Sequence, residues 1–213
     1  MKKSIVPNTC RYKIVFLLLI SVFFFQCEDP IYTPKPRAYP KIEYPEKTYR
    51  TFQEDYCTMT FEYPTYAKIE QDRFFFGDAP PSTCWFDIIF PNFDAVVHCS
   101  YIPIDKKNTL ETLQKDAFKM TDWHNKKATF TDDKFYENKN HVKGMTFDIE
   151  GPVASPIQFY LTDSLQEKHF IRGAFYFNSR ADQDSLAPIL SFVRTDIQRM
   201  LDTFDWEGEK MSK

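Results

Sequence analysis

The residues that could do chemistry are histidines, cysteines and scattered acidic pairs, and their spacing matches no familiar catalytic or metal-binding pattern. A zinc site needs three or four convergent ligands, whereas the histidines are well separated. The chain contains no glycine-rich phosphate loop and no GxSxG, HExxH or CxxC pattern. The sequence therefore presents no active site, cofactor site or metal site. The four histidines are His98, His124, His141 and His169.

Cys27 offers a different chemistry, because it ends a segment with the layout of a bacterial export signal. Basic residues open the chain, and an almost unbroken apolar run covers 14–25. That run is shorter than the roughly 20 residues that cross a bilayer as a helix. A cysteine at this junction resembles a lipobox, although Phe24 and Gln26 stand where leucine and a small residue are usual. We predict that residues 1–26 are removed and that Cys27 is lipidated; a plain signal peptide cut elsewhere is the alternative.

Three further cysteines remain in the exported chain, where an oxidising compartment favours pairing. Cys57 and Cys84 each open a strand-like run, so we prefer a disulfide between these two. Cys99 would then be a buried free thiol, which is common for a lone cysteine. The sequence alone does not fix the connectivity.

The segment 27–55 is rich in proline, with prolines at 30, 34, 36, 40 and 45. Proline fixes φ and removes hydrogen-bond donors, so we predict an extended, semi-rigid tether. Lys35, Arg37 and Tyr39 give it a basic and aromatic character that suits a docking peptide. A plain spacer is an equally good interpretation.

Length and charge point to one domain and to partners other than nucleic acid. The chain has 213 residues and a formal net charge of −3, whereas a nucleic-acid-binding domain is normally basic. Aromatic residues make up 17% of the chain and glycine is scarce, which suits β-rich packing. We predict a single domain over 56–206, within the usual size range, and a flexible tail over 207–213.

Alternating apolar and polar residues predict strands, and apolar residues three or four apart predict two helices. Consecutive strands joined by short turns form an antiparallel sheet, whose apolar faces the helices must cover. We predict an α+β fold with a single antiparallel β-sheet covered by two amphipathic helices, similar in element order to the Mog1/PsbP-like sandwich. The predicted strands are 57–63, 84–91, 95–102, 129–136, 142–150, 157–163 and 169–177.

The first predicted helix covers about 109–127. Asn108 and Glu111 form a capping-box pattern at its start. Its inner stripe is predicted to contain Leu110, Leu113, Ala117, Met120 and His124.

The last predicted helix has Asp184 or Ser185 as its N-cap and Pro188 in its first turn. An apolar stripe runs along one side of it, from Leu186 to Phe204. Its opposite, solvent-facing side is predicted to carry Arg194, Asp196, Gln198, Arg199 and Asp202.

Three consecutive phenylalanines precede a loop rich in small residues and proline. Phe74, Phe75 and Phe76 form either a core strand or an exposed binding patch. Trp85 follows shortly afterwards. We include these four aromatic residues, with the basic residues of the tether, among the candidates for binding a protein partner.

Four longer stretches are distinctive when they are read together: KPRAYPKIEYPEKTY (35–49), CTMTFEYPTYAKIE (57–70), CWFDIIFPNFDAVVHCSY (84–101) and DSLAPILSFVRTDIQRMLDTFDW (184–206). Their content and order resemble the gliding motility lipoprotein GldD family of Bacteroidetes. The Pro-Arg-x-Tyr-Pro segment and the terminal Phe-Asp-Trp are the most specific parts. Cys99 departs from the pattern, since an apolar residue is expected there.

The resemblance implies a cell-envelope lipoprotein needed for gliding over surfaces and associated with the gliding machinery and the linked type IX secretion system. It implies no enzyme activity and no cofactor. We therefore expect a non-enzymatic component or assembly factor, held by its lipid to the outer membrane rather than the inner one. Protein partners are expected in that machinery.

The alternative is an envelope lipoprotein that binds or hydrolyses polysaccharide or peptidoglycan. Aromatic surfaces and paired acids would supply the necessary groups, because glycoside cleavage uses two carboxylates in one cleft. The sequence places no two such carboxylates together.

Overall fold

The computed structural model describes residues 12–13, 41–72, 80–178 and 183–207. The chain divides into two compact units, Met1–Ala38 and Tyr39–Lys213. The fold described below belongs to the second unit. Within the described ranges, no helix combines the length and apolar character needed to cross a membrane.

The larger sheet has seven strands among the described residues, and each is antiparallel to its neighbours. Six of the seven were expected from alternation in the sequence; the short β3 was not. The strands are β3 (Lys68–Gln71), β4 (Trp85–Phe90), β5 (Ala95–Pro103), β6 (Phe130–Glu137), β7 (Lys143–Glu150), β8 (Ile157–Thr162) and β9 (His169–Phe177). Their order across the sheet is β3-β4-β5-β9-β8-β7-β6, which makes β6 an edge strand.

The prediction of a single sheet is wrong, because the structure also contains a second sheet of three strands. It contains β1 (Tyr49–Phe52), β2 (Met59–Pro64) and β10 (Asp205–Trp206) in the order β1-β2-β10. β1 lies inside the segment predicted as tether, and β10 has only two residues. Strands this short carry too little alternation to be recognised. The fold is nevertheless α+β, with antiparallel sheets and two main helices.

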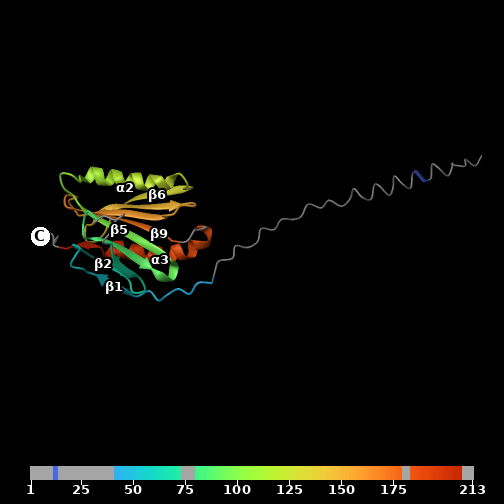
Figure 1. Cartoon of the computed structure of the whole chain (residues 1–213), viewed down its shortest axis with the longest axis horizontal. Coiled ribbons are helices and arrows are strands. Elements are labelled where there is room, and N and C mark those ends of the chain that lie inside the picture. Colours follow the sequence, from blue (N-terminus) through green and yellow to red (C-terminus); the bar gives the residue numbers. More distant parts are fainter. Residues whose placement is uncertain (1–11, 14–40, 73–79, 179–182, 208–213) are drawn as a thin grey trace, which may run out of the picture. The chain divides into compact units, whose positions relative to one another are not determined.

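The two helices, α2 (Leu110–Asn125) and α3 (Gln183–Thr203), lie on opposite faces of the large sheet. Figure 1 shows α2 above the large sheet and α3 below it, with β1 and β2 beyond α3. α2 contacts β7, β8 and β9, whereas α3 contacts β2. Because both faces of the sheet are covered, all six residues of β8 are buried.

Two hydrophobic cores result from this layering. The smaller one lies under α2 and joins Leu113 and Ala117 to Phe147, Tyr160 and Phe170. The larger one lies around α3, between the two sheets, and is dominated by aromatic rings. The predicted apolar stripe of α3 belongs to this larger core.

The start and inner face of α2 differ from the prediction by one residue each. The N-cap is Thr109, not Asn108, and its side chain accepts from the backbone N–H of Thr112. Thr121 is buried, whereas Met120 is 46% exposed. Thr121 tolerates burial because its hydroxyl donates to the carbonyl of Ala117 at 3.1 Å.

The first turn of α3 also lies earlier than predicted. The helix begins at Gln183, so Asp184 and Ser185 are helical residues and not the N-cap. Pro188 is then inside the helix and not in its first turn.

Candidate functional site

Most of the predicted partner-binding residues lie outside the described part of the chain. This group comprises Lys35, Arg37, Tyr39, Phe74, Phe75 and Phe76; Cys27, the predicted lipidation site, also lies outside the described part. Their roles stay predictions.

Trp85 is the one predicted binding residue that the structure describes. It opens β4 and is partly buried. Its indole Nε1–H donates to the backbone carbonyl of Tyr101 at 2.9 Å. The ring is thus held by its own domain, and only part of it is open to a partner.

Cys57 and Cys84, the preferred pair, are joined by a disulfide. It fixes the residue before β4 to the loop before β2. Cys99 is a buried free cysteine. Burial, followed by the charge of Asp87, raises the pKa of its thiol well above the ordinary range. Cys99 is therefore an inert core residue and not a nucleophile.

Two of the histidines lie beside the same ring: the centroid of Tyr176 is 5.6 Å from that of His98 and 6.1 Å from that of His124. His98 Nδ1 lies 2.7 Å from Asp87 Oδ1, and this hydrogen bond raises the pKa of His98. Burial, and then the charge of Arg172, lowers the pKa of His124. His169 stacks on Trp206. No three His, Cys, Asp or Glu side chains in the described ranges are grouped as metal ligands.

Asp196 on α3 is a buried carboxylate that the sequence analysis did not identify as a site. It binds side chains from the first described segment of the domain, which begins at residue 41. Asp196 is only 1% exposed, although it was predicted on the solvent face of the helix. Lys47 Nζ lies 2.9 Å from Asp196 Oδ1, and the hydroxyl of Tyr49 donates to the same oxygen at 2.7 Å. The hydroxyl of Tyr66 donates to Oδ2. We call these four residues the Asp196 cluster.

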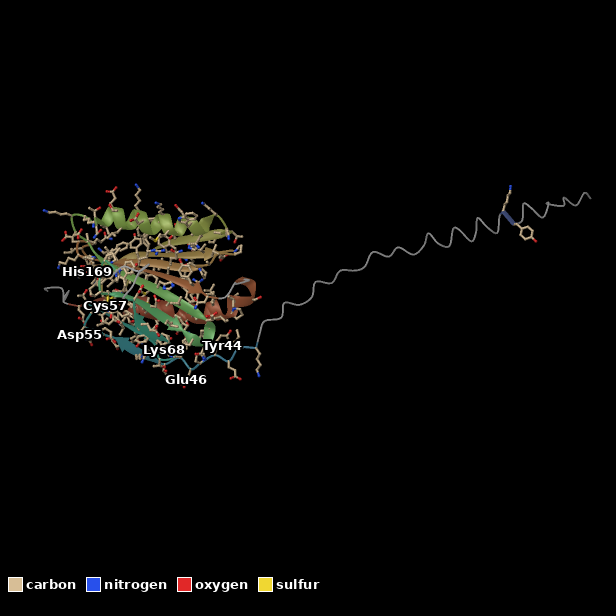
Figure 2. The ribbon with its side chains drawn as sticks, viewed as in Figure 1. Tyr44, Glu46, Asp55, Cys57, Lys68 and His169 are labelled. Carbon is tan, nitrogen blue, oxygen red and sulfur yellow. A yellow bond between two sulfur atoms is a disulfide. The ribbon has the colours of Figure 1, made fainter. Side chains whose placement is uncertain are left out.

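The Asp196 cluster fastens residues 41–52 to α3. Lys47 Nζ also donates to the carbonyl of Phe192 at 2.8 Å and lies 4.0 Å from the centre of its ring. The ring of Tyr44 packs on Phe192 at 4.7 Å between centroids. Figure 2 shows Tyr44 and Lys68 at one end of the domain, and Cys57 and His169 at the other. The second half of the predicted tether is therefore part of the folded domain.

The Asp196 cluster changes the pKa values of its two tyrosines, Tyr49 and Tyr66. Burial, followed by the hydrogen bond to Asp196, raises the pKa of Tyr49 to about 12. The same two causes raise the pKa of Tyr66 further still. Both hydroxyls are therefore donors to the carboxylate at every physiological pH. Asp196 lies three residues after Val193, at the border of the apolar stripe. This spacing is the feature of the sequence that could have indicated that Asp196 is buried.

A hollow of about 420 Å³ opens on the face of the sheet that α2 covers. Phe135, on its rim, is 91% exposed. The hydroxyl of Tyr160 accepts from Gln114 Nε2 at 3.2 Å, and Lys143 Nζ donates to the carbonyl of Ser164 at 2.9 Å. We call this opening the α2–β6 hollow. Its lining residues are Gln114, Phe135, Tyr136, Glu137, Lys143, Gly144, Tyr160 and Gln166.

Acidic groups gather along β6 beside the hollow. Burial raises the pKa of Asp133, and the nearby charges of Asp122 and Asp132 raise it further. Within the described lining of the hollow, however, Glu137 is the single carboxylate. Glycoside hydrolysis needs two carboxyl groups facing one cleft. The hollow has the groups to bind a ligand but lacks that pair.

Comparison with models of protein families shows which family this chain belongs to. The family model described as gliding motility lipoprotein GldD matches residues 29–206. This chain belongs to the GldD family. The resemblance read from four stretches of sequence is thereby confirmed. Membership implies a role in gliding motility and a membrane-anchored place in the cell envelope.

Other comparisons with this GldD-family chain are distant or empty. The solution structure of cyanobacterial PsbP (CyanoP) from Synechocystis sp. PCC 6803 is similar with a TM-score of 0.44 and 11% sequence identity. The similarity covers 82% of this chain and 99% of that one. No curated protein sequence matches.

The extent of the GldD match bears on both regions described above. It runs from the proline-rich segment through β10. The Asp196 cluster and the α2–β6 hollow therefore both belong to the part of the chain that defines the family.

Proposed function

We propose that this protein is a non-enzymatic component or assembly factor of the gliding and type IX secretion machinery, anchored by a lipid on Cys27. The observation that carries the proposal is the GldD match, which extends over the proline-rich segment and the whole α+β domain. The described part of the domain supports a binding role, because its open features are a hollow and exposed aromatic side chains.

The distance between lipid and domain is an important variable in this proposal. Because residues 41–52 are fastened to α3, we propose that the spacer is the rest of the predicted tether, residues 27–40. A chain of that length in an extended proline-rich conformation spans about 43 Å. The domain would then work close to the membrane that holds Cys27. We propose that this is the outer membrane.

The experiment that tests the proposal uses a gliding bacterium that lacks its own copy of this gene. Complementation with the full chain should restore gliding, whereas Cys27→Ala at the same protein level should not. Acyl labelling should show lipid on the full chain and none on Cys27→Ala. Full gliding of an unlipidated protein would contradict the anchored role.

The docking role of the connection needs a separate variant. Scrambling residues 34–40 at constant length removes the order of Lys35, Arg37 and Tyr39 but leaves Lys47 and the Asp196 cluster intact. If these residues bind a partner, gliding and co-purification of gliding or secretion proteins should both be lost. If both survive, the segment is a spacer.

A second candidate function is binding of envelope polysaccharide or peptidoglycan. The α2–β6 hollow favours it, because Phe135 and Tyr160 lie beside the polar groups of Gln114 and Glu137. Aromatic rings next to a few placed polar groups are typical of small ligand sites. Sedimentation of the purified domain with isolated peptidoglycan, with and without Phe135→Ala, tests this function.

A further inference from the structure

β6 is an unusual edge for a large sheet. It is one of the two edge strands of the seven-stranded sheet. It has eight residues, whereas a β-strand usually has about five or six. No strand in the described ranges pairs with its outer side. An edge strand of this length offers backbone donors and acceptors to an extended segment of another chain.

Exposed apolar side chains lie along the same strand. Phe135 is 91% exposed and Phe130 is 57% exposed, and they lie near opposite ends of β6. Leu165, in the loop that follows β8, is 71% exposed. Phe135 stabilises the fold little because so little of it is buried. Its ring is available to a partner at the rim of the α2–β6 hollow.

The charge of β6 decides what kind of strand can pair with it. Its sequence, FTDDKFYE, carries three carboxylates and one lysine. With three carboxylates and one lysine, each copy of β6 carries a net charge of −2, and this repulsion disfavours pairing between identical edges. A segment rich in lysine or arginine is complementary to it. The charge therefore favours a basic partner over a second copy of this chain.

The α2–β6 hollow supplies a place for a side chain of such a segment. Its volume of about 420 Å³ falls within the range of ligand pockets in proteins. Phe135 provides exposed aromatic surface, and Gln114 and Gln166 provide amide groups at the margin. Strand addition commonly combines backbone pairing with pockets for alternate side chains.

We propose that β6 and the α2–β6 hollow form a docking site for an extended, lysine- or arginine-rich segment of a protein partner. The segment adds to the sheet as a further strand and places one aromatic or aliphatic side chain in the hollow. This inference deepens the proposed function, on which it rests, by naming the chemistry of the partner.

The direct test uses the purified mature chain and two fluorescein-labelled peptides. One alternates lysine or arginine with valine and tyrosine; the other has glutamate in place of every basic residue. The basic peptide should bind, more weakly as salt is added, and the acidic peptide should not. Hydrogen exchange should slow at the amides of 130–137 when the basic peptide is bound. Equal binding of both peptides, or protection elsewhere in the domain, would overturn the proposal.

Two charge-matched variants sharpen this test. Phe135→Arg adds a positive charge at the rim of the hollow, whereas Trp123→Arg adds the same charge at an exposed aromatic position of α2 outside the lining of the hollow. Phe135→Arg should weaken peptide binding about tenfold, equivalent to roughly 1.4 kcal/mol. Trp123→Arg should leave it within about twofold. Equal effects of the two variants would refute a site at the hollow.

Cell experiments separate this inference from the proposed function. If Phe135→Arg abolishes gliding and Trp123→Arg does not, the docking site is supported. If both variants glide normally while Cys27→Ala does not, the docking site is wrong and the anchored role stands. If Phe135→Arg instead abolishes sedimentation with peptidoglycan and the basic peptide never binds, the hollow is a glycan site and the inference is overturned.

Discussion

The Asp196 cluster and the α2–β6 hollow are built from the same kinds of side chain and behave in opposite ways. Each contains tyrosine, a carboxylate and a lysine. In the Asp196 cluster these groups bond to one another, and the cavity that Asp196 helps to line measures only about 10 Å³. In the hollow, Tyr160 and Gln114 bond to each other, whereas Lys143 bonds to the carbonyl of Ser164, which is not part of the lining.

The difference follows from burial. A carboxylate that is withdrawn from water must be paired and hydrogen-bonded, which makes the Asp196 cluster a structural fastening. Glu137, Lys143 and Gln166 of the hollow keep access to water and need no such closure. Side-chain types alone therefore do not identify a site; the partners that each group has already found do.

The largest effect is expected from Lys47→Met. It removes the cation from Asp196, which stays buried with only tyrosine donors. Loss of one partner of a buried ion pair costs about 3–5 kcal/mol. Because Lys47 is partly exposed, we expect a loss of unfolding free energy of about 3 kcal/mol. Urea denaturation of the exported domain measures this loss of unfolding free energy.

The double variant Lys47→Met with Asp196→Leu is the control for this prediction. With both charges gone, no unpaired carboxylate remains, so part of the lost stability should return. A double variant less stable than the sum of the two single variants would show that the pair is not the source of the effect.

A middle-sized effect is expected from Asp163→Ala, beside the hollow. Asp163 is buried, and its carboxylate accepts the backbone N–H groups of Glu167, Lys168 and His169 at 2.9–3.1 Å. This loop carries Gln166 to the lining of the hollow. Because several donors lose their acceptor, we expect a loss of about 2 kcal/mol at neutral pH.

The pH dependence of that loss has a definite sign. Burial raises the pKa of Asp163, but the three backbone donors outweigh it and leave the pKa below its ordinary value of 3.8. The stabilisation is therefore complete above about pH 4 and is lost as the pH falls through the folded-state pKa. Denaturation at neutral and acidic pH should show the wild type and Asp163→Ala converging in acid. A constant difference would contradict this account.

The sequence predicted the large sheet well because its strands are long. β5, β7 and β9 each have eight or nine residues, many of them apolar, and turns separate them. β1, β3 and β10 have two to four residues, so no period was visible. The second sheet was missed for this reason.

The Asp196 cluster and the α2–β6 hollow could not be predicted from the sequence for a different reason. Asp196 was assigned to solvent because charged residues usually are, and its partners Lys47, Tyr49 and Tyr66 are more than 100 residues away in the chain. The hollow likewise combines residues of α2, β6, β7 and β8. Long-range contacts of side chains leave no local pattern to read.

A smaller effect is expected in the acidity of Tyr49. In Asp196→Asn the burial of Tyr49 persists, but the charged hydrogen-bond acceptor is gone. The pKa of Tyr49 should therefore fall from about 12 toward, but not to, its ordinary value of 10.0. Spectrophotometric titration of phenolate, with Tyr49→Phe to assign the signal, measures this change. An unchanged pKa would mean that burial alone sets it.

The smallest effect on stability is expected from Phe135→Ala. Because the ring is 91% exposed, its removal should change the free energy of unfolding by less than about 0.5 kcal/mol. Phe147, on the adjacent strand β7, is the control: it is 1% exposed, and Phe147→Ala should cost about 3–5 kcal/mol. If Phe135→Ala also cost more than about 1 kcal/mol, the ring would be packed in solution and the hollow closed. The contrast with the Asp196 cluster would then fail, because both regions would be fastenings of the fold.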